Sequence, residues 1–331
     1  MNELVSVIIP VYNGEKVITR CINSLIHQTY VDIEIIIVDD GSSDETERIC
    51  KGLLKIEPRI RYFRQCNQGV AYARNVGMKI SKGKYLCFVD ADDYTYPLYV
   101  ETLLYYLKQY HVSIAACNYQ KLQEGEHISK KCNIRKIKLM SKEDALSSLF
   151  YRKEMMGYPF LKLFARDILT GMSFPTEYAL GEDFQFVYSV FQNSSDIIYI
   201  DSVMYIYMQN NGSATHNLSI EPMEKIWIKL IEYLEENKND EQICRAIVTK
   251  IFITSIDFYI QLDKEKRNIL FKKKLKEYIK EHASQVFRDK QAGRIDRGLA
   301  LIGILNVDLL MQIAWLGKRI NAKTIIFRKA I

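Results

Sequence analysis

The 331-residue sequence lacks several short motifs that would assign it to common classes of nucleotide-binding or metal-dependent protein. The segment after its first apolar run, Pro10 to Glu15, has a single glycine and matches neither G-x-G-x-x-G nor G-x-x-x-x-G-K, which argues against a dinucleotide oxidoreductase and a P-loop NTPase. The five histidines show no H-E-x-x-H spacing, so a zinc site is not expected. The seven cysteines include no C-x-x-C pair, and we expect reduced, mostly buried thiols.

The chain also lacks the marks of a secreted or membrane-spanning protein. No basic segment precedes its first apolar run, and Pro10 interrupts that run, so we expect no signal peptide. A membrane span needs about 20 clean apolar residues. The longest apolar stretch, 298–317, contains Asn306, Asp308 and Gln312. We therefore expect a cytoplasmic protein in which 298–316 forms a buried or a membrane-surface helix.

Charge is distributed unevenly along the chain. The net charge is +6, but residues 261–331 alone hold 17 Lys and Arg against 7 Asp and Glu. This asymmetry favours an anionic partner, and nucleic acid is not among those expected. Two interpretations stay open. The basic region binds peripherally to an anionic membrane surface, at roughly 1 kcal/mol per nearby basic residue, or it is a helical subdomain with solvated lysines.

Continuous apolar runs alternate with amphipathic segments over the first 117 residues. The runs predict strands at 4–11, 34–38, 60–63, 84–89 and 113–117, and the intervening segments predict helices that include 15–28, 69–80 and 97–110. Ser42 and Glu45 have the spacing of a capping box. The alternation is typical of an α/β fold with a mostly parallel sheet covered on both faces. We expect one domain over 1–218 and a helical region over 219–331, basic from about 261.

Two acidic clusters follow predicted strands. Asp39-Asp40 ends the second strand, and the run Asp90-Ala-Asp-Asp93 follows the fourth. Ligands bind at the carboxyl ends of the strands in such sheets, so we expect both clusters at one site. Neighbouring carboxylates repel each other unless a cation or water relieves them, and Mg²⁺ or Mn²⁺ prefers one or two carboxylates together with phosphate oxygens. An acidic surface turn that caps the following helix is the alternative.

A third acidic pair, Glu182-Asp183, opens a predicted helix. The helix dipole favours acidic residues there regardless of function. A carboxylate at the rim of a dry cleft also suits a general base that takes a proton from an attacking hydroxyl.

Taken together, five segments in this order resemble the family 2 inverting glycosyltransferases with the GT-A fold: Val5–Asn13, Ile36–Thr46, Asn67–Gly77, Phe88–Asp93 and Gly181–Phe186. The resemblance covers residues 4–215. It implies an α/β GT-A fold and the transfer of a sugar, with inversion, from a UDP-linked nucleotide-diphosphate sugar to a hydroxyl group. The implied acceptor is a lipid-linked saccharide, in bacterial surface polysaccharide synthesis.

The resemblance also implies roles for individual residues. Eight of them would contact the nucleotide or the donor sugar: Pro10, Tyr12, Glu15, Asp39, Asn67, Gly69, Arg74 and Asp90. Asp39 would bind the base and Asp90 the ribose or donor hydroxyls. Asp92 would hold the Mn²⁺ or Mg²⁺ cofactor. Asp183 would be the catalytic base, with Glu182 beside it.

The sequence departs from the family pattern at two places. Leu161 stands where the family often has Asn, and Met208 stands where it often has Arg after Tyr207. Lys162 is then a candidate phosphate contact or simply a surface lysine. Four residues resemble the family loop that closes on the diphosphate: Tyr207, Ser213, Thr215 and His216.

Two other functions are weighed beside this resemblance. An aspartyl phosphohydrolase of the HAD type would use Asp90 as its nucleophile, but Asp93 stands where Thr or Val normally follows the second Asp. A non-catalytic module that binds a nucleotide or glycan stays open.

Overall fold

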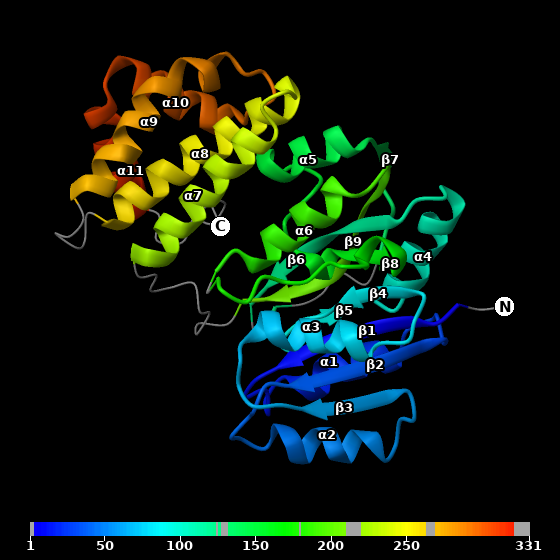
Figure 1. Ribbon diagram of the computed structural model, residues 1–331. Helices are drawn as coiled ribbons and strands as arrows, with labels where there is room; N and C mark the ends of the chain where they lie inside the picture. Colours follow the sequence, from blue (N-terminus) through cyan, green and yellow to red (C-terminus); the bar gives the residue numbers. More distant parts are fainter. Residues whose placement is uncertain are drawn as a thin grey trace. The chain divides into compact units, whose positions relative to one another are not determined.

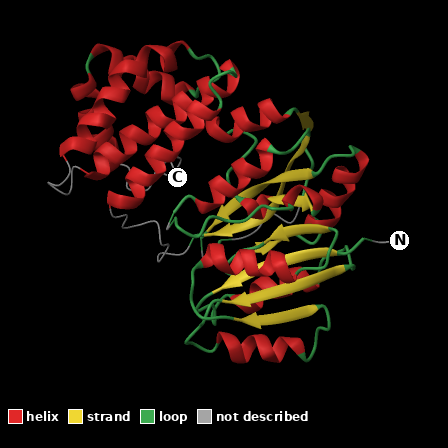
Figure 2. Cartoon of the chain, viewed as in Figure 1, coloured by secondary structure: helices red, strands yellow, loops and turns green. Residues whose placement is uncertain are grey.

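A computed structural model of the chain describes residues 3–123, 125–126, 132–178, 180–209, 220–262 and 269–320 (Figure 1). The chain forms two compact units, one of residues 1–145 and 154–216 and one of residues 146–153 and 217–331. The first unit holds the β-sheet, and the second is built from helices (Figure 2).

The N-terminal strands form the parallel half of the sheet, in the order β3-β2-β1-β4. They are β1 (Val5–Val11), β2 (Ile33–Asp39), β3 (Ile60–Arg64) and β4 (Tyr85–Phe88). Every residue of β1 and β2 is buried, because helices cover both faces. Pro10 is tolerated in this central strand because β4 pairs with β1 only as far as Ile8.

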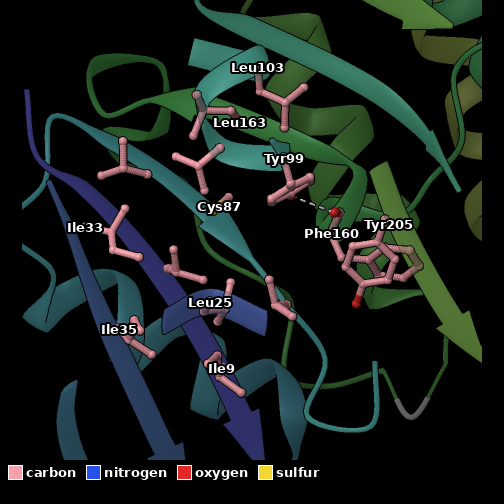
Figure 3. Close-up of a cluster of buried hydrophobic side chains, with 14 of the residues drawn as sticks. Ile9, Leu25, Ile33, Ile35, Cys87, Tyr99, Leu103, Phe160, Leu163 and Tyr205 are labelled. Carbon is pink, nitrogen blue, oxygen red and sulfur yellow. Dashed lines mark hydrogen bonds between the residues drawn. The ribbon is translucent and has the colours of Figure 1, made fainter. Parts of the chain in front are cut away.

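Alternate residues of these strands face different helices. One face packs against α1 (Ile18–Ile26), α2 (Thr46–Leu54) and α4 (Tyr99–Gln109) in the main core cluster. Figure 3 shows part of this core, where the hydroxyl of Tyr99 donates a hydrogen bond of 2.8 Å to the backbone oxygen of Phe160. On the other face, Ile36 and Val38 pack against Ala73 of α3 (Val70–Ile80).

The remaining strands make the sheet mixed, because all but one of their pairings are antiparallel. The prediction of a mostly parallel sheet therefore holds throughout the first half and for a single pair in the second. The full order is β3-β2-β1-β4-β8-β6-β9-β5, with β7 paired to β9. These strands are β5 (Tyr94–Thr95), β6 (Ile114–Leu122), β7 (Ile137–Met140), β8 (Lys162–Ala165) and β9 (Ile197–Met208). The strand β8, antiparallel to β4 and β6, was not predicted because its four residues give no clear period.

The predicted capping box at Ser42 and Glu45 is wrong. The helix α2 begins at Thr46, and neither residue caps it with its side chain. Ser42 instead donates its backbone N–H to Asp39, and its hydroxyl accepts the backbone N–H of Asn13. The carboxylate at the end of β2 therefore organises this turn.

The second unit contains the C-terminal part of α5 (Lys142–Tyr151) and five further described helices. These are α7 (Ile220–Glu236), α8 (Glu241–Leu262), α9 (Ile269–Arg288), α10 (Arg294–Leu305) and α11 (Val307–Ile320). The helix α8 packs against α7, α9 and α11. No helix of the described segments is long and apolar enough to cross a membrane.

The predicted single helix over 298–316 is two helices. Asn306 between them has an extended backbone, and its side-chain oxygen accepts the backbone N–H groups of Asp308 and Leu309. A side chain that satisfies the first N–H groups of α11 stabilises a new helix start at this point.

Two helical glycines provide a test of packing between α3 and β1. A Cβ atom at Gly77 would lie 2.3 Å from Cγ2 of Ile8, whereas a Cβ atom at Gly52 in α2 would meet nothing within 4 Å. We expect Gly77→Ala to destabilise the protein by about 1–3 kcal/mol through overpacking. The control Gly52→Ala should stabilise it by about 0.5–1 kcal/mol, because alanine favours helix. Urea denaturation measures both, and a stabilising Gly77→Ala would contradict the close packing.

Candidate active site

A buried arginine joins three carboxylates from distant parts of the sequence. The side chain of Arg74, on α3, is only 4% exposed. Its Nη2 lies 2.9 Å from Oδ1 of Asp90, just past β4, and its Nη1 lies 2.6 Å from Oδ1 of Asp183. The Oε1 atom of Glu182 is 3.7 Å from the same Nη1. Both acidic residues belong to the first turn of α6 (Glu182–Gln192).

The segment before α6 supports the arginine from one side. The guanidinium carbon of Arg74 lies 5.3 Å from the ring centroid of Phe174. The next residue, Asn75, donates to the backbone oxygen of Phe174 at 2.8 Å and accepts its N–H at 2.7 Å. Phe174 stacks on Phe186 of α6 with ring centroids 3.8 Å apart. Arg74 and Asn75 therefore fix the approach to α6.

The environment of Asp183 changes its acidity. Burial raises the pKa of Asp183 to about 7, against the opposing charge of Arg74. Glu182 and Asp90 raise the pKa further by repulsion. About a quarter of the Asp183 side chain, 23%, remains exposed. A carboxylate with a pKa near neutrality and an exposed edge has the properties of a general base.

The three aspartates of the acidic run have different environments. Asp90 is paired with Arg74, as described above. Asp93 is fully buried, and its carboxylate accepts hydrogen bonds from the Tyr205 hydroxyl at 2.7 Å and the Met208 N–H at 2.8 Å. Burial, followed by repulsion from Asp90 and Asp92, raises the pKa of Asp93 well above its ordinary value. Asp93 thus connects the acidic run to the end of β9.

Asp92 is partly exposed, and its backbone oxygen accepts a hydrogen bond from Arg20. The described residues contain no group of three or more His, Cys, Asp or Glu side chains that could surround a metal ion. A cation at Asp92 would therefore take most of its ligands from phosphate oxygens and water. This is the usual coordination of Mg²⁺ in phosphate sites, so the residues present fit a metal bound together with a diphosphate.

The other acidic cluster holds loops at the carboxyl ends of the strands. Asp39 is fully buried, and it accepts the Ser42 N–H at 2.8 Å and the Tyr62 hydroxyl at 2.5 Å. Asp40 accepts the backbone N–H groups of Gln68 and Gly69 at 2.9 and 2.7 Å. Both carboxylates thus have partners within the chain, and Asp40 fixes the loop that enters α3.

The predicted nucleotide contacts lie around these loops in different environments. Pro10 is buried within β1, while Tyr12, Asn67 and Gly69 are exposed. The carboxylate of Glu15 accepts the backbone N–H of Glu45 at 3.1 Å. Among the predicted site residues, ion pairs join Arg74 to Asp90 and to Asp183.

Lys162 is not the surface residue that one interpretation expected. It is fully buried, and its ammonium group donates to the backbone oxygens of Met156 and Tyr158 at 2.6 and 2.8 Å. Burial lowers the pKa of Lys162 to about 7. Of the predicted closing loop, Tyr207 belongs to β9, whereas Ser213, Thr215 and His216 lie outside the described residues.

Some residues of this region had no role predicted from the sequence. Asn75 stands inside a motif that was identified, but no role was predicted for it. Tyr205, whose hydroxyl donates to Asp93 and accepts the Asp90 N–H at 3.1 Å, had no sequence signal because it lies 115 residues from Asp90. These residues support the acidic run and its flanking loops.

Known proteins are similar to this chain in sequence. The chain is 33% identical over 222 residues to glycosyltransferase GlyA of Streptococcus pneumoniae, a match that covers 64% of this chain and 32% of GlyA. It is 32% identical over 219 residues to the uncharacterized glycosyltransferase EpsJ of Bacillus subtilis, covering 65% of this chain and 64% of EpsJ. The match thus spans about a third of GlyA and just under two thirds of EpsJ.

Solved structures show a similar fold at low sequence identity. S. aureus TarS, residues 1–349, in complex with UDP-GlcNAc has a TM-score of 0.65 at 19% identity, covering 95% of this chain and 91% of that one. The mannosyltransferase PcManGT from Pyrobaculum calidifontis, in complex with GDP-Man and Mn²⁺, has a TM-score of 0.54 at 15% identity, covering 98% and 89%. The predicted GT-A fold with a helical C-terminal region is therefore confirmed.

The glycosyl transferase family 2 model matches residues 6–171, which make up half of the chain and include the acidic run and Arg74. On this match, the chain belongs to glycosyl transferase family 2.

Proposed function

We propose that the protein transfers a sugar, with inversion, from a nucleotide-diphosphate sugar to a hydroxyl group of a saccharide acceptor. The observation that carries this proposal is the contact of one buried guanidinium with Asp90 and Asp183. It joins a carboxylate assigned to the donor with one assigned to the acceptor. The UDP-GlcNAc bound to TarS supports a UDP-linked donor.

Asp183 acts on the acceptor in this proposal. Its carboxylate takes the proton of the attacking hydroxyl while the acceptor oxygen bonds to the anomeric carbon, and the bond from that carbon to the diphosphate oxygen breaks. Such assistance contributes about 10²–10⁴-fold to the rate. A pKa of about 7 leaves the side chain a competent base near neutral pH.

Arg74 positions this base. Its two ion pairs fix the carboxylate of Asp183 relative to Asp90, which would bind donor hydroxyls. The guanidinium charge also opposes the rise of the Asp183 pKa that burial causes. Arg74 thereby favours the ionised form that can accept a proton.

Asp92 would hold the Mn²⁺ or Mg²⁺ cofactor. When bound, the divalent cation supplies positive charge that stabilises the departing diphosphate. Nucleotide contacts from Pro10, Tyr12, Glu15, Asp39, Asn67 and Gly69 remain part of the proposal. For Asp39 and Glu15, hydrogen bonds to the ligand would add to those the carboxylates already accept from the chain.

The proposed acceptor is a lipid-linked saccharide of bacterial surface polysaccharide synthesis, used in the cytoplasm at the inner face of the membrane. The basic region from 261 onward supports this setting. Family membership argues against the HAD phosphohydrolase alternative. A non-catalytic binding module is the alternative that activity must exclude.

A donor screen tests the proposal as a whole. We expect UDP-sugars, rather than GDP- or CDP-sugars, to be hydrolysed or transferred with Mn²⁺ or Mg²⁺, and chelation to abolish the reaction because the leaving diphosphate loses its counter-charge. Release of the nucleoside diphosphate measures turnover. No metal-dependent turnover of any donor would exclude the proposed activity.

Replacement of the base separates binding from chemistry. Asp183→Asn keeps an oxygen for Arg74 but cannot take a proton, so kcat should fall by about 10²–10⁴-fold while calorimetry shows nearly unchanged donor affinity. In the wild type, kcat/KM should rise with pH through about 7, where Asp183 becomes ionised, and then level off. The exposed Asp196→Asn is the control. Near-normal activity of Asp183→Asn would rule out this base.

Removal of the buried charge should destabilise the site. Arg74→Met leaves Asp90 and Asp183 without their cation, and we expect a loss of about 3 kcal/mol, the lower end for buried pairs because both partners are partly exposed. The loss should be smaller at about pH 5.5 than at about pH 8, because Asp183, whose pKa is about 7, is protonated at the lower pH and then no longer carries the negative charge that Arg74 offsets.

Arg48→Met provides the matched control for this measurement. Arg48 pairs with Glu45 on the surface, so its removal should change stability by at most about 0.5 kcal/mol at either pH. Urea denaturation measures both variants. Equal, small effects would show that the buried pairs do not stabilise the fold.

A further inference from the structure

The helix α10 exposes large apolar side chains and buries small residues. A surface helix of a globular protein normally exposes polar residues and buries apolar ones. Here Ile295, Leu301, Ile304 and Leu305 are each more than 40% exposed, and Leu305 is 75% exposed. The inner side is formed by small residues, since Ala300 and Gly303 are buried.

The helix α11, which packs against α10, also exposes large apolar side chains. Leu309, Ile313 and Leu316 follow one another at spacings of four and three residues, and each is at least 40% exposed. Residues three and four apart lie on one side of a helix. The opposite side of α11, with Val307, Leu310, Met311 and Ala314, is buried in the core of the helical unit.

The exposed side chains are therefore not needed to hold these helices in place. Seven large apolar residues on two consecutive helices form what we call the α10–α11 face: Ile295, Leu301, Ile304, Leu305, Leu309, Ile313 and Leu316. Single exposed apolar residues are common, but a concentration of this kind marks an interaction site.

Exposed basic residues lie on α10 and on α9, which packs against α10 and α11. Arg294 is exposed in the first turn of α10. The helix α9 packs against both helices and exposes Lys273, Lys274, Lys280 and Arg288, together with Glu277 and Glu281. Residues 261–331 carry ten more basic than acidic residues. The partner of this face therefore has apolar and anionic character.

We propose that the α10–α11 face binds the surface of a membrane containing anionic lipids, with its leucine and isoleucine side chains entering the boundary between headgroups and acyl chains. Helices that lie in this boundary combine an exposed apolar side with Lys and Arg. A second copy of the chain fits less well, because it would bring the same excess of positive charge to the interface. The proposal does not depend on the sugar transferred.

Vesicle flotation of the full chain tests the proposal. We expect binding to phosphatidylcholine vesicles with about 30 mol% phosphatidylglycerol, weaker binding to phosphatidylcholine alone, and loss of affinity at high salt. Leu301→Glu with Leu305→Glu should reduce binding at least tenfold. Ile56→Glu with Val31→Glu is the matched control, because Ile56 is as exposed as Leu305, at 75%, but lies in the first unit.

A second pair of variants tests the charges. Lys274→Gln with Arg294→Gln should weaken binding roughly fivefold per charge removed. Lys55→Gln with Lys79→Gln removes two exposed lysines from the first unit and should have no effect. All substituted side chains are exposed, so the unfolding temperature should stay the same in every variant and loss of binding cannot be attributed to unfolding.

Several outcomes would overturn the proposal. One is an absence of wild-type binding to anionic vesicles, and another is equal binding by the wild type and the leucine variant. Equal binding to neutral and anionic vesicles would refute the requirement for anionic lipid. A lipid-free dimer of the wild type that the leucine variant cannot form, measured by sedimentation, would assign the face to self-association instead.

Discussion

The active-site region depends on the buried positive charge of Arg74. A cation removed from water costs several kcal/mol unless charged partners and hydrogen bonds replace the lost solvation. Arg74 obtains these partners from the exit of β4 and from the first turn of α6, which are far apart in the sequence. The fold is therefore constrained to bring α3, β4 and α6 together, and the contacts of Asn75 with Phe174 hold the same elements from the side.

The same constraint gives chemically identical residues different properties. Asp90 is fixed by Arg74, and Asp93 is buried against Tyr205 and the end of β9. Asp92, between them, remains at the edge of the protein. The three carboxylates of the run therefore differ in their surroundings: Asp93 is buried and hydrogen-bonded, Asp90 is ion-paired, and Asp92 is partly exposed. This division is what a site for a metal and a diphosphate requires, because only part of the run needs to face the ligand.

The sequence predicted features that depend on local patterns. β1 and β2 follow from their continuous apolar runs, and the GT-A fold follows from five motifs in order, which the family match confirms. The mixed second half of the sheet did not follow, because β8 has only four residues and its partners are set by tertiary contacts. Likewise, the pairing of Arg74 with Asp183 spans 109 residues and leaves no local signal. The site roles taken from the resemblance remain predictions.

In the helical unit, the hydrogen bonds of one side chain determine which apolar residues of α10 and α11 are exposed. Asn306 interrupts an apolar stretch because its side chain satisfies the N–H groups that begin α11. Once the stretch is divided, each half packs its small or inward-facing residues into the core, as Ala300 and Leu310 do, and leaves its remaining large apolar residues outside. Packing alone would allow polar residues at those outer positions, since surface substitutions usually change stability little. The proposed lipid surface accounts for their apolar character, and it is consistent with the positive charge of this region.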